Sequence, residues 1–177
     1  MKVKTKIIIG TGIAFAGILF LMRNKIASAV WDLVSENRIK KLHPAIQNKV
    51  RTFINRAEKE GIQLRVTDGL RTFQEQDDLY AQGRTKPGKI VTNAKAGQSY
   101  HNYGLAVDVV PMVNGRPNYK DDYQKMARIG KSLGFTWGGD FKNLSDKPHF
   151  HMTFGNSIAE LQNKVLKKQV QNGYVIV

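Results

Sequence analysis

Apolar residues recur along the first part of the chain with two periods, one typical of helices and one of strands. Over residues 44–61 the spacing is helical, which predicts a helix with the apolar face Ile46, Val50, Phe53, Ile54 and Ala57. Residues 62–66 alternate apolar and polar positions and predict a strand. After a turn, the capping-box pair Thr72 and Glu75 predicts a second helix that ends near residue 83.

The rest of the chain predicts strands and helices in mixed order. Residues 104–110 alternate like a strand, and Asn114-Gly115 after them indicates a hairpin turn. The same periods predict a helix over 126–133, a strand over 135–137, a strand over 148–154 and a terminal helix over 158–165. This order predicts a small single α+β domain with a largely antiparallel sheet flanked by helices.

One long connection interrupts this pattern. Residues 84–100 are rich in Gly, Lys, Thr and Asn and carry no clear period. A loop of this length inside a small domain is usually functional or disordered. Because it leads directly into the strand at 104–110, we expect it to form one wall of a substrate site.

The N-terminus has the pattern of an export signal. Lys2, Lys4 and Lys6 precede an apolar run from Ile7 to Met22, and Ala27-Ser28-Ala29 resembles a cleavage site. We therefore expect an N-terminal hydrophobic helix that is a signal peptide or membrane anchor over 1–29. The alternative is a buried core helix.

This leader sets the expected organisation of the chain and its location. A linker or short helix over 30–43 would join the leader to a domain over 44–177. The domain is then expected in the cell envelope, exported or anchored outside the cytoplasm.

Composition narrows the chemistry and the partners. The chain has no cysteine, which excludes disulfides and thiolate metal sites, so a transition metal would need His, Asp or Glu ligands. The formal net charge of +14 favours an anionic neighbour. No nucleic-acid-binding signature is present, so we expect an anionic cell-wall polymer or membrane surface, and no nucleic acid.

The strand predicted at 104–110 carries the first candidate chemistry. Gly104, Ala106 and Asp108 would share one face, opposite an apolar face of Leu105, Val107 and Val109. His101 approaches from the preceding loop, so a histidine and a carboxylate would meet over a surface without bulky side chains. Taken alone, a hydrogen-bonded His–Asp pair is as good an interpretation as a metal site.

A second cluster near residue 150 favours the metal site over the hydrogen-bonded pair. His149 and His151 would share one strand face, and Asp146 lies in the turn before them. With His101 and Asp108 there are four candidate ligands, whereas a catalytic zinc usually takes three protein ligands and a water. One histidine should therefore only support the others, and Asp146 suits a general base acting on metal-activated water.

Two further residues have competing interpretations. Arg71 follows the strand at 62–66 and precedes a capped helix, so it could be a solvated turn residue or a fixed cation that stabilises an oxyanion. The residues alone do not decide between these. His43, beside Pro44 at a helix start, is expected to be structural.

These segments resemble a known family. Ser99-x-His101-x-x-Gly104-x-Ala106-x-Asp108, followed by Asp146-x-x-His149, is similar to the zinc signature of the bacterial D-Ala-D-Ala carboxypeptidase and dipeptidase family. The resemblance is greatest to its L-alanyl-D-glutamate endopeptidase branch of phage endolysins and bacillar wall hydrolases. Further matching segments between Arg38 and Phe154 are Leu42-His43-Pro44, Asp68-Gly69-Leu70-Arg71-Thr72 with Gln76, and Gly97-Gln98-Ser99-Tyr100-His101.

The resemblance implies a role for each residue. One Zn²⁺ per chain would be held by His101, Asp108 and His149. Asp146 would be the general base and Arg71 the contact to the carbonyl or oxyanion. The residues expected to bind substrate or support the ligands are His151, Ser99, Gln76 and Tyr103.

The predicted function is therefore a zinc metallopeptidase that hydrolyses the stem peptides of peptidoglycan, with the L-Ala–D-Glu bond as its expected target. A D-Ala-D-Ala carboxypeptidase is the nearest alternative. A non-catalytic zinc-bearing binding module is another, although it would not need Asp146. A further alternative, less favoured by the sequence, is a membrane-tethered nucleic-acid binder. It predicts salt-sensitive DNA binding that does not depend on the His and Asp residues.

Overall fold

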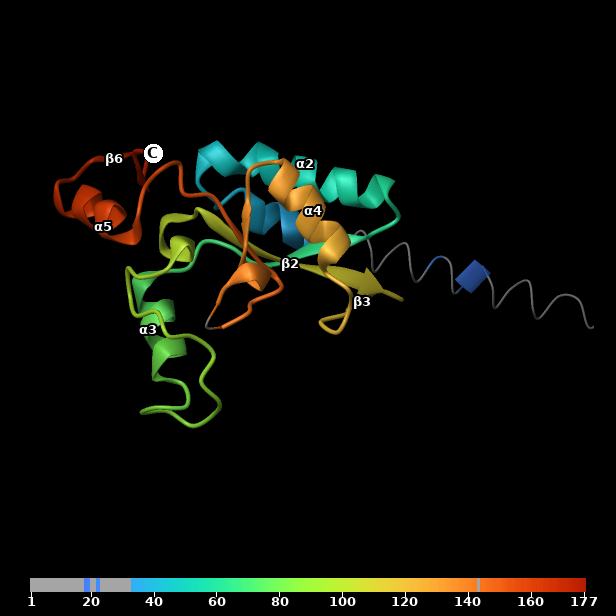
Figure 1. Ribbon diagram of the computed structural model, residues 1–177, viewed down its shortest axis with the longest axis horizontal. Helices are drawn as coiled ribbons and strands as arrows, with labels where there is room; N and C mark the ends of the chain where they lie inside the picture. The colour runs from blue at the N-terminus through green and yellow to red at the C-terminus, as the bar shows by residue number, and fades with distance from the viewer. Residues whose placement is uncertain (1–17, 20–21, 23–32, 143) are drawn as a thin grey trace, which may run out of the picture.

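A five-stranded antiparallel sheet forms the centre of the computed structural model, which describes residues 18–19, 22, 33–142 and 144–177 (Figure 1). The strand order is β1-β2-β5-β4, and β3 pairs with β2 at the far end of that strand. In chain order the elements are α2 (Pro44–Lys59), β1 (Leu64–Asp68), α3 (Phe73–Ala81), η1 (Tyr100–Tyr103), β2 (Ala106–Val113), β3 (Arg116–Pro117), α4 (Gln124–Ser132), β4 (Thr136–Trp137), η2 (Gly138–Asp140), β5 (His149–His151), α5 (Ile158–Leu166), β6 (Val170–Gln171) and β7 (Tyr174–Val175). The predicted α+β domain with a largely antiparallel sheet is confirmed.

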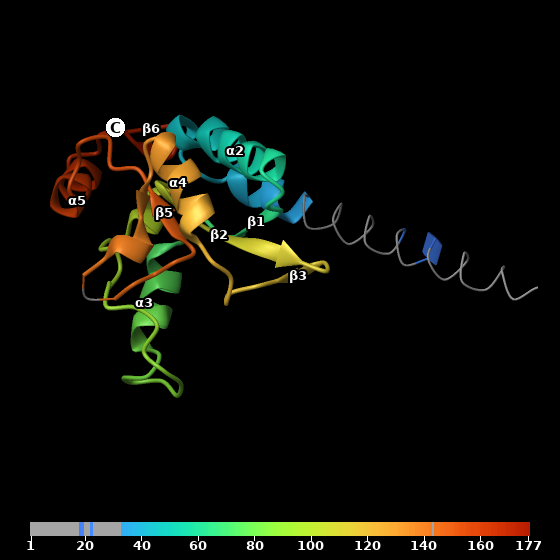
Figure 2. The ribbon, with the colours of Figure 1, turned by 45° about the vertical axis from the view of Figure 1, so that its right-hand side comes forward.

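Helices α2 and α4 cover one face of the sheet (Figures 1 and 2). The predicted stripe of α2 is largely buried, and the Phe53 ring packs edge-on against Phe150 of β5 with centroids 4.9 Å apart. Gly130 lets α4 approach closely, since a Cβ there would lie 2.6 Å from the Phe150 ring. Helix α3 and the connection after it extend from the opposite side. This leaves the second face of the sheet available for a site.

Residues 33–43 belong to the packed domain. Residues 33–39 are helical, and Ile39 and Leu42 are buried in the core. The Ser35 hydroxyl accepts a hydrogen bond from Val66 N at 3.1 Å, and Arg38 donates to Val66 O at 2.9 Å. The predicted start of the domain at Pro44 therefore lies inside the packed part of the chain, because apolar side chains before it complete the core.

The predicted leader over 1–29 and its hydrophobic helix lie outside the described residues, except for residues 18, 19 and 22. Among the helices that the structure describes, none has both the length and the apolar character needed to cross a membrane.

Strand boundaries differ from the prediction where the backbone is left-handed. Strand β2 begins at Ala106 because Gly104 ends η1 with φ at 66°, and a Cβ on Gly104 would lie 2.7 Å from His43 N. Strand β5 ends at His151, ahead of Phe154, whose φ is 48°. The hairpin turn is confirmed, since Asn114 and Gly115 both have positive φ between β2 and β3.

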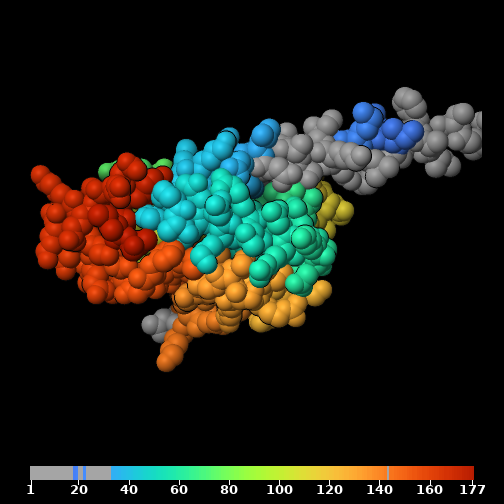
Figure 3. Space-filling view, turned by 90° about the horizontal axis from the view of Figure 1, so that it is seen from above, coloured from blue at the N-terminus to red at the C-terminus, as the bar shows by residue number. Residues whose placement is uncertain are grey.

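His43 has the structural role that was predicted. Its Nδ1 accepts from Ala45 N at 3.1 Å and caps α2, while Nε2 donates to Val175 O at 2.8 Å. This second bond ties the β6–β7 hairpin to the start of α2. Viewed from above, α2 and α4 form one surface, with α5 and the C-terminal residues at one end of it (Figure 3).

Candidate metal centre

Sheet register brings the two predicted clusters together. Strand β2 lies between β1 and β5, so Asp108 is paired with Asp68 on one side and with His149 on the other. His101 reaches the same place from η1, immediately before β2. Residues about forty positions apart in the sequence thus become neighbours through antiparallel pairing.

Three donor atoms form a nearly equilateral triangle. His101 Nε2 lies 3.1 Å from His149 Nδ1, and Asp108 Oδ1 lies 3.3 Å from each of these nitrogens. Both histidines are buried, and the Asp108 side chain is 20% exposed. Within the described part of the chain, these three residues are the group of His, Cys, Asp and Glu side chains that could hold a metal ion.

The triangle fits a tetrahedral zinc ion. Two ligands bound tetrahedrally at about 2.0–2.1 Å lie about 3.3–3.4 Å apart, which matches the observed edges. Asp108 Oδ1 is buried, yet it accepts no hydrogen bond of normal geometry. An unsatisfied buried carboxylate oxygen is costly unless a cation or donor reaches it. The residues present therefore suit Zn²⁺ in both donor type and spacing.

Electrostatics keeps the Asp108 carboxylate ionised. Burial by itself would raise its pKa, but His101 and His149 together hold the pKa well below its usual range. Burial conversely disfavours the charged form of His101, and the Asp108 carboxylate outweighs this and raises its pKa. The centre therefore has one anionic oxygen facing two imidazole nitrogens.

His151 lies beside the triangle and outside it. Its Nδ1 is 3.1 Å from His149 Nε2, on the side of the His149 ring away from Asp108. The Tyr100 ring stacks on His151 at 4.4 Å between centroids, with the planes 7° apart. Burial and the two neighbouring histidines lower the pKa of His151 to about 3, so the ring is neutral. His151 thus contacts a candidate ligand without joining the cluster.

Asp146 is a partly buried carboxyl group in the same cleft. Its backbone N donates to Gly138 O at 2.9 Å, and its backbone O accepts from His149 N at 3.2 Å. Gly138 permits this approach, since a Cβ there would lie 2.5 Å from Asp146 O. Burial and then the Asp108 charge raise the pKa of Asp146. A raised pKa favours a carboxyl group that both takes and returns a proton.

Arg71 is held in place. Its Nη1 donates to Gln76 Oε1 at 2.7 Å, its Nη2 pairs with Asp68, and its side chain is 13% exposed. Gln76 is fully buried and donates to Ala94 O at 2.7 Å. The structure therefore favours the interpretation of Arg71 as a fixed cation over that of a solvated turn residue.

The two remaining candidates differ in position. Ser99 lines the cleft, and its hydroxyl accepts from His101 N at 3.3 Å at the start of η1. Tyr103 is buried and donates to Gly97 O at 2.7 Å, and neither Tyr103 nor Gln76 is part of the cleft wall. These two side chains hold the surrounding backbone and Arg71.

A cleft of about 830 Å³ lies over the centre. Residues 91–94 and 98–100 line it, so the long connection forms a wall as predicted. The site residues that line it are Asp68, Arg71, Ser99, His101, Asp108, Asp146, His149 and His151. The cleft thus joins the donor triangle, the raised-pKa carboxyl group and the fixed cation in one space.

Comparisons with known proteins show the family of this chain. Residues 92–152 match the family model described as D-alanyl-D-alanine carboxypeptidase. The peptidoglycan L-alanyl-D-glutamate endopeptidase CwlK of Bacillus subtilis (strain 168) is 43% identical over 122 residues, covering 63% of this chain and 73% of the relative. The chain belongs to the peptidase family of this model and of CwlK.

A phage protein and two solved structures are also similar to this chain. The L-alanyl-D-glutamate peptidase of Listeria phage A118 is 28% identical over 121 residues, which cover 66% of this chain and 40% of the phage protein. Among solved structures, the Serratia marcescens L-Ala D-Glu endopeptidase ChiX has a TM-score of 0.48 and 28% identity, covering 68% of this chain and 86% of that one. The vancomycin resistance D,D-pentapeptidase VanY in complex with Zn(II) has a TM-score of 0.49 and 17% identity, covering 63% and 72%.

The sequence analysis did not identify several residues that line the cleft. Phe141 packs near His149 and His151, with ring centroids 5.7 and 6.0 Å away, and Lys142 and Leu144 also line the cleft. These residues lie in the segment between η2 and β5, which has no period. Their position a few residues before Asp146 is the sequence feature that could have identified them.

Proposed function

We propose that this protein is a zinc metallopeptidase that hydrolyses the peptide stems of peptidoglycan, with the L-Ala–D-Glu bond as its target. The observation that carries the proposal is the donor triangle of His101, Asp108 and His149, which opens into the same cleft as Asp146. The choice of bond is supported by CwlK, whose name gives that activity.

His101, Asp108 and His149 would hold one Zn²⁺ per chain. Bound there, the ion would lower the pKa of a water to about 7 and polarise the scissile carbonyl. The cleft over the three ligands leaves room for the substrate beside them. Other divalent ions accept the same ligand types, so zinc identity is part of the proposal.

Asp146 would move the proton. Its carboxylate accepts a proton from the attacking water as the carbon–oxygen bond forms. The same group then gives that proton to the leaving amine as the carbon–nitrogen bond breaks. The raised pKa of Asp146 supports both halves of this role, because it brings the group nearer to the working pH.

Arg71 would face the carbonyl oxygen. A preorganised cation stabilises the negative charge that develops on this oxygen during attack. Gln76 and Asp68 hold the guanidinium, which favours this role over a mobile one. Ser99 and Tyr103 would support the backbone that carries His101 and the cleft wall.

Product analysis tests the proposed reaction. The protein is incubated with defined muropeptides, with and without chelator, and the products are identified by mass spectrometry. We expect a peptide that begins with D-Glu, loss of turnover with chelator, and recovery on adding Zn²⁺. Unchanged cleavage after complete removal of metal would contradict the metal mechanism.

A second candidate, a D-Ala-D-Ala carboxypeptidase, is favoured by the description of the matching family model. It would use the same residues on the other end of the stem. Free D-alanine among the products, without a D-Glu-terminated peptide, would identify this activity instead.

We also propose where the protein acts. Residues 1–29 would be a signal peptide or membrane anchor that places the peptidase domain outside the cytoplasm, where peptidoglycan lies. The positive charge, +14 for the whole chain, would draw the domain to anionic wall polymers or to the membrane surface.

A further inference from the structure

The proposed reaction gives His151 no role, yet this side chain contacts His149, one of the candidate ligands. We propose that His151 is a positioning residue that fixes the tautomer of His149: it accepts a hydrogen bond from His149 Nε2 and so leaves Nδ1 free to bind the metal. This inference rests on the zinc function proposed above and extends it to the support of the ligands.

His101 shows how such a tautomer is set. Its Nδ1 lies 2.7 Å from Gly69 O, and a carbonyl oxygen can only accept a hydrogen bond. The hydrogen of a neutral His101 ring is therefore on Nδ1, and Nε2 presents a lone pair to the triangle. A backbone carbonyl thus prepares this ligand for a metal.

His149 needs the opposite tautomer. Its Nδ1 is the ring nitrogen that faces His101 and Asp108, so a metal held in the triangle requires the hydrogen on Nε2. Nε2 of His149 faces His151 Nδ1 at 3.1 Å. For this bond to form, His151 Nδ1 must be the acceptor, with its own hydrogen on Nε2.

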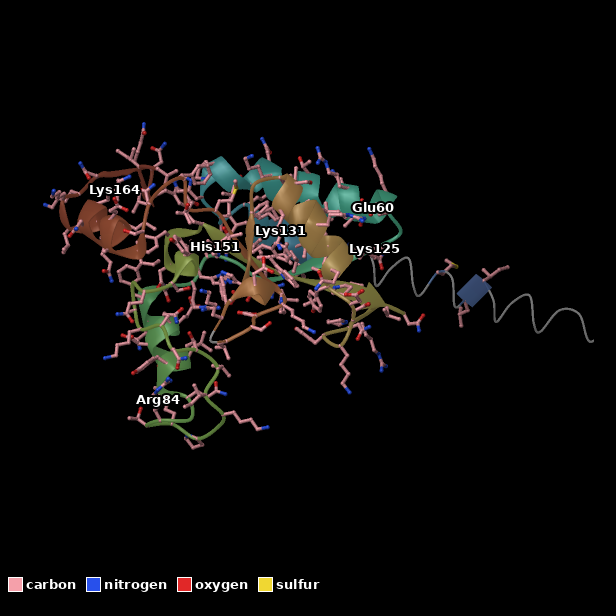
Figure 4. The ribbon with its side chains drawn as sticks, in the orientation of Figure 1. Glu60, Arg84, Lys125, Lys131, His151 and Lys164 are labelled. Atoms are coloured by element: carbon pink, nitrogen blue, oxygen red, sulfur yellow. The ribbon has the colours of Figure 1, made fainter. Side chains whose placement is uncertain are left out.

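The His151 ring is held in the orientation that this bond requires. Tyr100 stacks on it in a parallel arrangement, and the Tyr100 hydroxyl donates to Asn156 O at 3.1 Å. Phe141 packs near the ring with centroids 6.0 Å apart. His151 lines the cleft near the middle of the domain (Figure 4), but it is only 6% exposed, so little solvent can replace its Nδ1 as the acceptor.

Two variants separate an acceptor role from a packing role. His151→Leu keeps an apolar side chain of moderate size and removes the acceptor. His151→Asn places an amide oxygen near the position of Nδ1 and restores it. The full chain is freed of metal, and its Zn²⁺ dissociation constant is measured by competition with a chromophoric chelator.

We expect His151→Leu to weaken Zn²⁺ binding by about 10- to 100-fold, the usual effect of removing a partner of a metal-bound histidine. His151→Asn should recover most of this loss. The absorption spectrum of the Co²⁺-loaded protein should change in the Leu variant and return toward the wild-type spectrum in the Asn variant.

A matched control uses another buried histidine. His43→Leu removes the cap of α2 and should lower the melting temperature while leaving Zn²⁺ affinity unchanged, because His43 bonds Ala45 and Val175 and does not contact the triangle. Melting of each metal-free variant shows that it is folded.

Four results would contradict the positioning role, the proposed function or both. Wild-type Zn²⁺ affinity in His151→Leu, or an Asn variant as weak as the Leu variant, would overturn the positioning role. A wild-type protein that binds Zn²⁺ tightly but cleaves no muropeptide would overturn the proposed function, and the affinity ratios would still decide the role of His151. A folded wild-type protein that binds no Zn²⁺ would overturn both.

Discussion

At the scale of single residues, two carboxyl groups in one cleft have opposite environments. Asp108 faces His101 and His149, which lower its pKa, whereas burial and the Asp108 charge raise the pKa of Asp146. When the pKa values of two neighbouring groups are shifted in opposite directions, the groups commonly have different catalytic roles: one stays ionised and the other exchanges a proton. This contrast supports Asp108 as a ligand and Asp146 as the base.

The division of roles predicts the behaviour of Asp146→Asn. We expect kcat to fall by about 10²- to 10⁴-fold, since the amide cannot carry the proton, while zinc content stays at the wild-type level. Turnover on muropeptides and metal analysis of the same samples measure the two effects. Asp140→Asn is the control, because Asp140 pairs with Lys131 and does not line the cleft. Loss of metal from Asp146→Asn would make Asp146 a ligand and contradict its assignment as the base.

At the scale of elements, the junction between η1 and β2 sets the position of His101. Gly104 ends η1 with a left-handed backbone, and its carbonyl accepts from His43 N at 2.9 Å. The chain then enters β2 and reaches Asp108 two residues into the strand. One glycine therefore decides how the histidine and the carboxylate of the triangle face each other.

Gly104→Ala should disturb this junction more than a glycine substitution with room around it. The added Cβ would lie 2.7 Å from His43 N at a φ of 66°, so we expect a loss of more than about 1 kcal/mol in the free energy of unfolding. Zinc affinity should also fall.

Gly155→Ala is the matched control for that variant. Gly155 has a similar φ of 77° but no atom within 4 Å of the added carbon, so it should show backbone strain alone. Denaturant unfolding and chelator competition measure both variants. Equal effects of the two substitutions would contradict a steric role for the Gly104 contact.

At the scale of the whole molecule, the segment before α2 is part of the stable domain. Arg51 of α2 donates to Glu36 at 2.5 and 3.1 Å and joins residues 33–39 to the helix. The hydrogen bonds from Arg51 lower the pKa of Glu36 below 4.5. The pKa of Glu36 is lower in the folded than in the unfolded protein. The pair therefore stabilises the fold above the unfolded pKa, and this stabilisation is lost as the pH falls through the folded pKa.

Glu36→Gln should therefore destabilise the protein by up to about 1 kcal/mol at neutral pH, since the pair is partly exposed and screened. The difference in free energy of unfolding between wild type and variant should shrink as the pH falls below 4.5. Urea unfolding at several pH values measures this difference. A difference that stays constant down to low pH would show that the charge of Glu36 is not its cause.

The sequence by itself determined features that depend on neighbouring residues. The apolar period of α2, the capping box of α3 and the Asn114-Gly115 turn follow from backbone sterics and side-chain hydrogen bonds within a few positions. The spacing of His101 and Asp108 also lies within one short segment. These features were predicted correctly for this reason, apart from strand ends set by left-handed residues.

The family resemblance already implied the ligand set, but the tertiary structure decided how contacts between distant segments build the site. Pairing of β2 with β5 placed His149 against Asp108, and Gln76 with Asp68 turned Arg71 from a possible surface residue into a fixed one. Packing of Ile39 and its neighbours moved the start of the domain before Pro44. Strand register and buried polar contacts depend on the whole set of packed side chains, so no local period could reveal them.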